Sequence, residues 1–188
     1  MTPNIAQRLT DGEHNRIWNT LPKRMNQAVA RENLLLIRKA FQKHVTTFWL
    51  MYGTLLGCVR EGNFIPHDKD IDIGVYAKEL DSIFATLLTL RNFGFDIVRA
   101  ESDDSYLTVQ KNNISTDIYV MTRDNDGWHW GDIQENDYFT ILDTIPFLGH
   151  TFLGPHPIVD FLVDHYGPDW KKPKSNAQAT LHRRTLCP

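Results

Sequence analysis

The chain has 188 residues, of which 41% are hydrophobic and 23% are charged, a balance typical of a globular domain. Its formal net charge of −3 provides no overall attraction for nucleic acid or for an anionic membrane, so nucleic acid is not an expected partner. The sequence has no run of the ~18 apolar residues that a transmembrane helix needs. Its cysteines, Cys58 and Cys187, have the spacing of neither a metal site nor a disulfide framework. These features predict a cytoplasmic protein without a transmembrane segment, and they leave peripheral membrane contact open.

The hydrophobic pattern predicts helices and strands in alternation. Residues 26–44 carry apolar side chains at helical spacing, and residues 46–53 form a β-branched and aromatic run that ends at a glycine, as a buried strand does. The further elements expected, in chain order, are a helical turn at 53–62, a strand at 70–76, a helix at 77–94, strands at 95–100, 105–111 and 115–122, hairpins within 127–133 and 139–155, and a helix at 159–167.

This order of elements predicts an α+β fold, in which a mixed β-sheet is flanked by helices and followed by small C-terminal hairpin and helix elements. We assign residues 1–25 to a polar N-terminal segment and residues 26–173 to the folded domain. Residues 174–188 form a basic, polar tail.

Acidic residues alternate with apolar ones in the segment DKDIDIGV, residues 68–75. Because successive side chains on a strand point to opposite faces, Asp70 and Asp72 share one face, with Cβ atoms about 6.6–7 Å apart. Two buried carboxylates repel each other unless a cation compensates them, and Mg²⁺ or Mn²⁺ prefers such oxygen ligands. Asp117, in the apolar segment ISTDIYVM, would complete a site of three carboxylates if the two strands are neighbours. Alternatively, these acids lie at a solvated sheet edge or cap turns, an interpretation that also suits Asp68 in the preceding loop.

The segment YGTLLGCVR, residues 52–60, precedes the acidic strand. Gly53 and Thr54 end one predicted strand and begin a helical turn, so their backbone N–H groups and the Thr54 hydroxyl are suited to phosphate oxygens. Arg60 follows and could pair with a phosphate, or form a salt bridge with a neighbouring acid, Asp68 or Glu61. A phosphate-binding turn followed by paired aspartates is the arrangement of a nucleotidyltransferase.

The longer segment YGTLLGCVREGNFIPHDKDIDIGV resembles the core motif of the LicD and fukutin-related family. In that family, GTLLG-x-x-R leads through F-I-P into an acidic D-x-D-[IV]-D run. The matching positions are Gly53, Thr54, Leu55, Leu56, Gly57, Arg60, Phe64, Ile65, Pro66, Asp68, Asp70 and Asp72. The resemblance extends from about residue 30 to about residue 173 and includes the closing DHYGPDWKKP. It departs at His67, where the family usually has Trp, and at Lys69, where an acid is frequent.

The resemblance implies a nucleotidyltransferase (polymerase-beta-like) fold and a metal-dependent phosphotransferase. Such an enzyme moves a phosphorylated alcohol, phosphocholine in bacterial members or ribitol phosphate in animal relatives, from a CDP-linked donor to a glycan or glycolipid hydroxyl, as in lipopolysaccharide or capsule biosynthesis. It implies that Asp70, Asp72 and Asp117 are catalytic and ligate Mg²⁺ or Mn²⁺. The substrate-binding residues it implies are Gly53, Thr54, Arg60 and Asp68. Two alternatives are nucleotidyl transfer to a small-molecule hydroxyl and a catalytically inactive module that binds a nucleotide or sugar phosphate.

Two further features have open roles. The segment GWHWGD places Trp128 and Trp130 around His129, either as a stacking wall for a base or sugar or as aromatic packing across strands. Cys58 lies among apolar residues and is expected to be a small core residue rather than a nucleophile.

Overall fold

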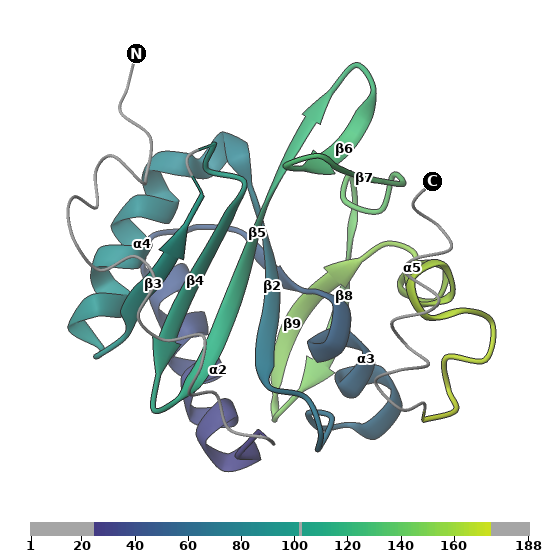
Figure 1. Ribbon diagram of the computed structural model, residues 1–188, viewed down its shortest axis with the longest axis horizontal. Helices are drawn as coiled ribbons and strands as arrows, with labels where there is room; N and C mark the ends of the chain where they lie inside the picture. The colour runs from purple at the N-terminus through teal and green to yellow at the C-terminus, as the bar shows by residue number, and fades with distance from the viewer. Residues whose placement is uncertain (1–24, 102, 174–188) are drawn as a thin grey trace.

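A computed structural model describes residues 25–101 and 103–173 (Figure 1). Its α-helices are α2 (Gln27–Lys43), α3 (Tyr52–Glu61), α4 (Leu80–Asn92) and α5 (Ile158–Tyr166), and a 3₁₀ turn, η1 (Ala77–Glu79), precedes α4. Its strands are β1 (Phe48–Leu50), β2 (Asp70–Tyr76), β3 (Asp96–Ala100), β4 (Tyr106–Lys111), β5 (Ile114–Asp124), β6 (Gly127–Trp130), β7 (Ile133–Glu135), β8 (Leu142–Phe147) and β9 (His150–Pro155). Except for Met25, the predicted N-terminal segment lies outside the described residues, as does the predicted tail.

A mixed sheet forms the centre of the domain, which confirms the predicted α+β class. Its strands follow the order β1–β2–β5–β4–β3, and β6 and β7 extend it beyond β5. Strands β2 and β5 run parallel, and the other pairs of neighbouring strands in this sheet are antiparallel. The predicted C-terminal hairpin is β8–β9, which forms a separate two-stranded sheet.

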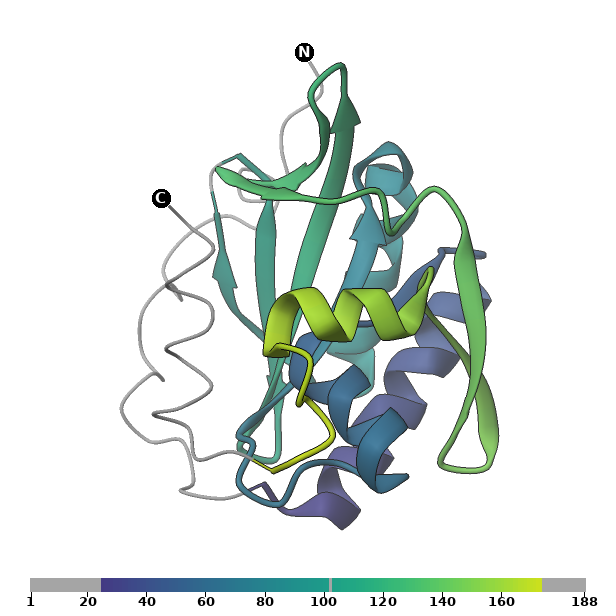
Figure 2. The ribbon, with the colours of Figure 1, turned by 90° about the vertical axis from the view of Figure 1, so that its right-hand side faces the viewer.

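Helices α2 and α4 pack against each other and cover one face of the sheet (Figures 1 and 2). Helix α3 contacts β2, and α5 packs against α3 and β9. Helix α2 begins at Asn26, whose side-chain oxygen accepts hydrogen bonds from the backbone N–H groups of Ala28 and Val29. Its apolar stripe is buried, as the helical spacing predicts. The apolar positions of β2, Ile71 and Ile73, are 0% exposed, so one face of this strand belongs to the core.

The strand predicted over residues 46–53 is shorter in the structure and covers Phe48–Leu50. Met51 still donates its backbone N–H to the Asp72 carbonyl at 3.0 Å, but Tyr52 has a φ of 36° and the chain turns there into α3. Next to β1, Gly74 of β2 lies against the Trp49 ring, which a Cβ at this position would overlap. Backbone geometry therefore ends the strand early and brings the start of α3 next to Asp72.

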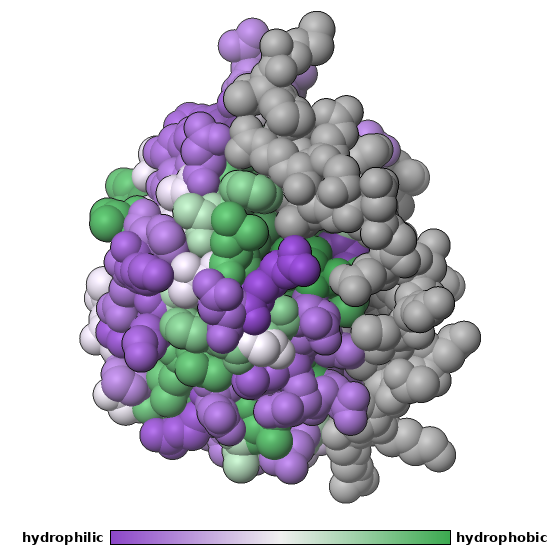
Figure 3. All heavy atoms as spheres, turned by 90° about the vertical axis from the view of Figure 1, so that its left-hand side faces the viewer, coloured by the Kyte–Doolittle hydropathy of each residue, from purple (hydrophilic) through white to green (hydrophobic). Residues whose placement is uncertain are grey.

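The outer surface on the side of α4 mixes polar and apolar residues. Figure 3 shows several small hydrophobic areas separated by hydrophilic residues on the part of this side that is coloured. Within the described residues, no helix combines the length and the apolar character that crossing a bilayer requires.

Candidate active site

The acids predicted to form the site lie on one face of the sheet. Strands β2 and β5 pair in parallel register, with Asp72 opposite Asp117 and Asp70 opposite Ser115. Residues paired across neighbouring strands point to the same face, and so do residues two apart on one strand. Asp70, Asp72 and Asp117 therefore project from the face opposite to Ile71 and Ile73, as the alternation in the sequence indicated.

Asp68, which the sequence assigned to substrate binding, lies close to the two aspartates of β2. One carboxylate oxygen each from Asp68, Asp70 and Asp72 lies within 4.8 Å of the others. Asp68 reaches this position because the loop before β2 is fixed at its backbone: Asp68 donates its N–H to the Ile65 carbonyl at 3.0 Å, and its own carbonyl accepts the N–H of Met25. The structure thus groups Asp68, rather than Asp117, with the two aspartates of β2.

Asp117 is held beside this group by neutral donors. Its Oδ1 accepts a hydrogen bond from the Thr108 hydroxyl at 2.9 Å, and the Tyr106 hydroxyl donates another. Burial and, to a lesser extent, the negative charge of Asp70 raise the pKa of Asp117 to about 6, although the two hydroxyl donors act in the opposite direction. A buried carboxylate with such a pKa is suited to accept a proton near neutral pH.

Tyr119, which lies outside the matched motif, forms a hydrogen bond with Asp72. The Tyr119 hydroxyl donates to Asp72 Oδ1 at 3.2 Å, and burial together with the Asp72 charge raises the pKa of Tyr119 far above its usual value. This hydroxyl therefore stays protonated and remains a donor. The sequence contained a signal for it, because Tyr119 is two residues after Asp117 on the same strand and must share its face.

The turn at the start of α3 forms two hydrogen bonds with Asp72. The Gly53 N–H donates to Asp72 Oδ2 at 3.0 Å, and the Thr54 hydroxyl accepts the Asp72 backbone N–H at 2.8 Å. Thr54 is 1% exposed, so its hydroxyl joins α3 to β2 and does not have the free surface that we expected for a phosphate contact. Phosphate binding by the backbone of this turn stays a prediction.

Gly53 has a steric reason to be glycine. A Cβ at this position would overlap Asp68 Oδ2 and would lie 3.2 Å from Asp72 Oδ2. The missing side chain therefore gives two carboxylates the space to approach the same point of the backbone. Gly53, which the sequence indicated as a turn residue, therefore lies in direct contact with the acidic group.

Arg60 has the salt-bridge partner that the sequence left as one alternative. Its Nε lies 2.8 Å from Glu61 Oε1, and its Nη1 donates to the Trp170 carbonyl at 3.3 Å. Seven residues separate Arg60 from Gly53, which amounts to about 10 Å along a helix. A phosphate contact by Arg60 therefore stays a prediction with no support in these contacts. His67 is exposed in the loop.

The two tryptophans of β6 have different roles. Trp128 is 7% exposed and packs against Tyr76 and Phe139, as hairpin aromatics usually do. Trp130 packs edge-on against Tyr119, with ring centroids 4.9 Å apart. Both line a cavity of about 1070 Å³ that also includes Tyr52 and Tyr119. Aromatic packing across strands therefore applies to both tryptophans, and a stacking wall for a base or sugar stays a prediction.

Solved structures with this architecture define the class of the fold. ANT(2'')-Ia in complex with adenylyl-2''-tobramycin has a TM-score of 0.55, with 84% of this chain and 90% of that chain covered at 12% identity. The lincosamide antibiotic adenylyltransferase LnuA, bound to lincomycin, has a TM-score of 0.53, with 82% and 96% covered at 15% identity. At these identities the likeness shows the fold alone, which is that of nucleotidyltransferases.

The sequence places the chain within that class. The LicD/FKTN/FKRP nucleotidyltransferase domain matches residues 45–156, so the chain belongs to this family and the resemblance is confirmed. Ribitol-5-phosphate transferase FKTN of Macaca fascicularis is 27% identical over 168 residues, which are 82% of this chain and 36% of that protein. Ribitol 5-phosphate transferase FKRP of Homo sapiens is 27% identical over 138 residues, 64% of this chain and 28% of that protein. The chain thus spans little more than a third of these curated relatives at most.

Proposed function

We propose that this protein is a metal-dependent phosphotransferase that moves a phosphorylated alcohol from a CDP-linked donor to a hydroxyl of a glycan. The carrying observation is the group of Asp68, Asp70 and Asp72, whose oxygens lie within 4.8 Å, next to a fourth carboxylate, Asp117, with a raised pKa. The relatives named as ribitol-5-phosphate transferases support the reaction class.

The donor set fits a hard divalent cation. Mg²⁺ and Mn²⁺ prefer oxygen ligands, and carboxylates that share one point of space repel each other unless a cation lies between them. Asp68, Asp70 and Asp72 are the residues that would hold it, and Asp117 stays a candidate ligand from the neighbouring strand. When bound, the metal would supply charge neutralisation for the phosphate oxygens of the donor.

The protein's own residues can then account for positioning and proton transfer. The Tyr119 hydroxyl and the Gly53 N–H each hold one oxygen of Asp72, so this carboxylate is oriented before any ligand arrives. The acceptor hydroxyl would give its proton to Asp117 as its oxygen attacks the phosphorus of the transferred group. The bond from that phosphorus to the bridging oxygen breaks, and the nucleoside monophosphate leaves with the electron pair. No covalent intermediate with the protein is needed.

The test is a donor panel with matched variants. The full chain is incubated with Mg²⁺ or Mn²⁺ and either CDP-ribitol, CDP-choline or nucleoside triphosphates, in the presence of a glycan acceptor. We expect CMP release from a CDP-linked donor, and a loss of at least about 10²-fold in Asp70→Asn and Asp72→Asn. Asp96→Asn, at an exposed position of β3, is the control and should keep its activity.

Three outcomes would contradict the proposal. Pyrophosphate release from a nucleoside triphosphate would indicate nucleotidyl transfer to a hydroxyl instead. Binding of nucleotide without turnover would indicate a catalytically inactive binding module. Near-normal activity in both Asp70→Asn and Asp72→Asn would remove the acidic group from the mechanism.

A further inference from the structure

A large cavity adjoins the acidic group and has no role in the mechanism above. It has a volume of about 1070 Å³ and is lined by residues of β6, β7 and α5 and of the segment between β7 and β8. Two of its lining residues also belong to the surroundings of the acids: Tyr52 directly precedes Gly53, and Tyr119 donates its hydroxyl to Asp72. A ligand in this cavity would therefore lie next to residues that border the acidic group.

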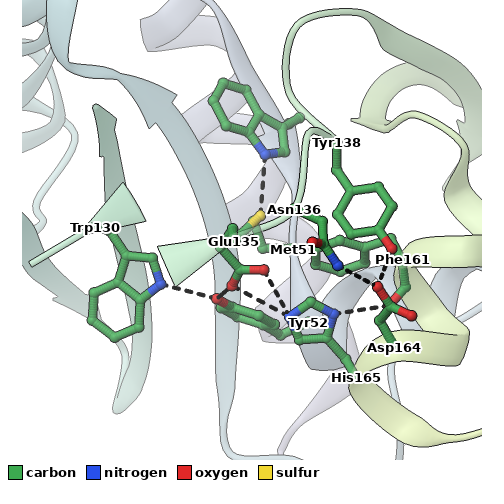
Figure 4. A network of polar contacts seen from close by, with 10 residues as sticks. Met51, Tyr52, Trp130, Glu135, Asn136, Tyr138, Phe161, Asp164 and His165 are labelled. Atoms are coloured by element: carbon green, nitrogen blue, oxygen red, sulfur yellow. Dashed lines mark hydrogen bonds and ion pairs between the residues drawn. The ribbon is translucent and has the colours of Figure 1, made fainter. Parts of the chain in front are cut away.

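The inner wall of the cavity is held by a network of hydrogen bonds (Figure 4). The Tyr52 hydroxyl donates to Glu135 Oε1 at 2.7 Å and accepts the indole N–H of Trp130 at 3.0 Å. His165 Nε2 lies 3.1 Å from Glu135 Oε2, and its Nδ1 lies 2.8 Å from the Phe161 carbonyl. Both ring nitrogens of His165 therefore lie within hydrogen-bond distance of oxygen atoms, and the ring fixes the position of the Glu135 carboxylate.

Beyond this wall, the lining offers both donors and acceptors. The Asp164 carboxylate accepts hydrogen bonds from the Asn136 amide at 2.8 Å and from the Tyr138 hydroxyl, all neutral donors (Figure 4). The Gln134 side-chain amide also lines the cavity and donates its N–H to the Asp126 carbonyl at 2.6 Å. Carboxylate and amide oxygens accept and amide N–H groups donate, so the set matches hydroxyl groups, which do both.

The acidic charge of the lining disfavours a phosphate in the cavity and tolerates an uncharged, hydroxyl-bearing group. Four of the lining residues are acids, and Arg123 is the one lysine or arginine among the described lining residues; the acids are Asp126, Glu135, Asp137 and Asp164. Arg123 lies 3.8 Å from Asp137 at the surface. An anionic phosphate would be repelled there, whereas a neutral hydroxyl-rich group would not. Acids and aromatic rings also attract a trimethylammonium cation, so choline is the competing ligand that the test below must include.

We propose that this cavity binds the hydroxyl-rich, uncharged part of a substrate and so determines which substrate the enzyme accepts. The proposal rests on the proposed function for its position beside the reacting phosphate. The same chemistry has two sources, the polyol of a donor and the sugar ring of an acceptor. Trp130 supplies an aromatic face, and Asp164 with Asn136 supplies the hydrogen bonds.

The test is saturation-transfer NMR on the full chain with ribitol and, separately, with methyl β-D-galactoside as probes. We expect transfer to the carbon-bound protons of at least one probe, and a loss of affinity of about tenfold in Asp164→Asn and Asn136→Ala. The controls are Asp160→Asn, an exposed acid on the same helix, and Asn92→Ala, an exposed amide at the end of α4; both should stay within about twofold. Preference for ribitol assigns the cavity to the donor, and preference for the galactoside assigns it to the acceptor.

A parallel titration with CDP and Mn²⁺ separates the two proposals. Cavity variants should bind CDP with unchanged affinity, because the acidic group is intact. Equal affinity of wild type and cavity variants for both probes, or transfer to choline methyl protons with none to either probe, would overturn the cavity proposal while leaving the phosphotransferase proposal standing. Probe binding that depends on Asp164 in a protein that releases no CMP would instead retain the cavity and refute the reaction.

Discussion

Gly53→Ala is the substitution that best separates folding from the chemistry of the acidic group. The added Cβ would overlap Asp68 Oδ2 and lie 3.2 Å from Asp72 Oδ2. Both atoms are ends of side chains, so Asp68 can swing away without a backbone movement. Because alanine is favoured over glycine within a helix by up to about 1 kcal/mol, the free energy of unfolding should change by no more than about that amount.

The effect on metal binding should be much larger. Once Asp68 is displaced, its oxygen leaves the group that the three carboxylates form, and Asp72 is crowded at the atom that Gly53 N–H holds. Displacing an oriented ligand lowers metal affinity by at least about tenfold. Isothermal titration with Mn²⁺, together with urea unfolding of the same preparations, measures both quantities.

Gly57→Ala is the matched control in the same helix. A Cβ there would lie 2.6 Å from the Asn63 carbonyl oxygen and 3.0 Å from the Ile65 N, which are backbone atoms that cannot swing away. This variant should therefore lose stability by about 1–3 kcal/mol. If Gly53→Ala bound Mn²⁺ like the wild type, the assignment of the acidic group as the metal site would be refuted. A loss of stability as large as that of Gly57→Ala would instead contradict the free movement of the Asp68 side chain.

Three further changes have distinct expected outcomes. Tyr119→Phe removes the hydroxyl that donates to Asp72 Oδ1 and should weaken Mn²⁺ binding about tenfold by calorimetry with the fold retained; unchanged affinity would remove Tyr119 from the site. Thr54→Val leaves the Asp72 backbone N–H buried without its acceptor and should cost about 1–3 kcal/mol in urea unfolding, so an unchanged midpoint would contradict the bond. Burial raises the pKa of the Cys58 thiol to about 12, so iodoacetamide at pH 8 should leave this residue unmodified in the native protein and label it in urea, as peptide mapping would show; rapid native labelling would contradict its burial.

Much of the fold was predictable because its signals are local. The alternation in DIDIGVY gave strand β2 its bounds, and the apolar spacing before His44 gave α2 to within one residue at each end. The strand over 46–53 was predicted too long because nothing in its composition reveals the positive φ of Tyr52, which the packing of α3 against β2 imposes. The hairpins β6–β7 and β8–β9 were expected as hairpins, but the attachment of the first to β5 was not.

The acidic group likewise combines residues that a local pattern predicted with residues that only the tertiary structure brings together. The spacing of Asp70 and Asp72 fixes their common face, since it depends only on the period of a strand. Asp68 could not be assigned in this way, because its position depends on a loop whose backbone bonds to Met25 and Ile65. The sequence left Arg60 with either a phosphate contact or a salt bridge; the structure shows the contact with Glu61, and the phosphate contact stays a prediction.

The amino-acid sequence by itself determined the family and the pair of aspartates on β2, because each is encoded in residues that are close neighbours along the chain, and the order of the predicted elements indicated a mixed sheet. Tertiary structure alone decided that Tyr119 supports Asp72 across 47 residues, that Asp68 joins the acids, and that Glu135 and His165 form the wall of a cavity beside them. These contacts depend on the register between strands and on where α5 packs, and both are set by the sum of many distant contacts that no short segment specifies.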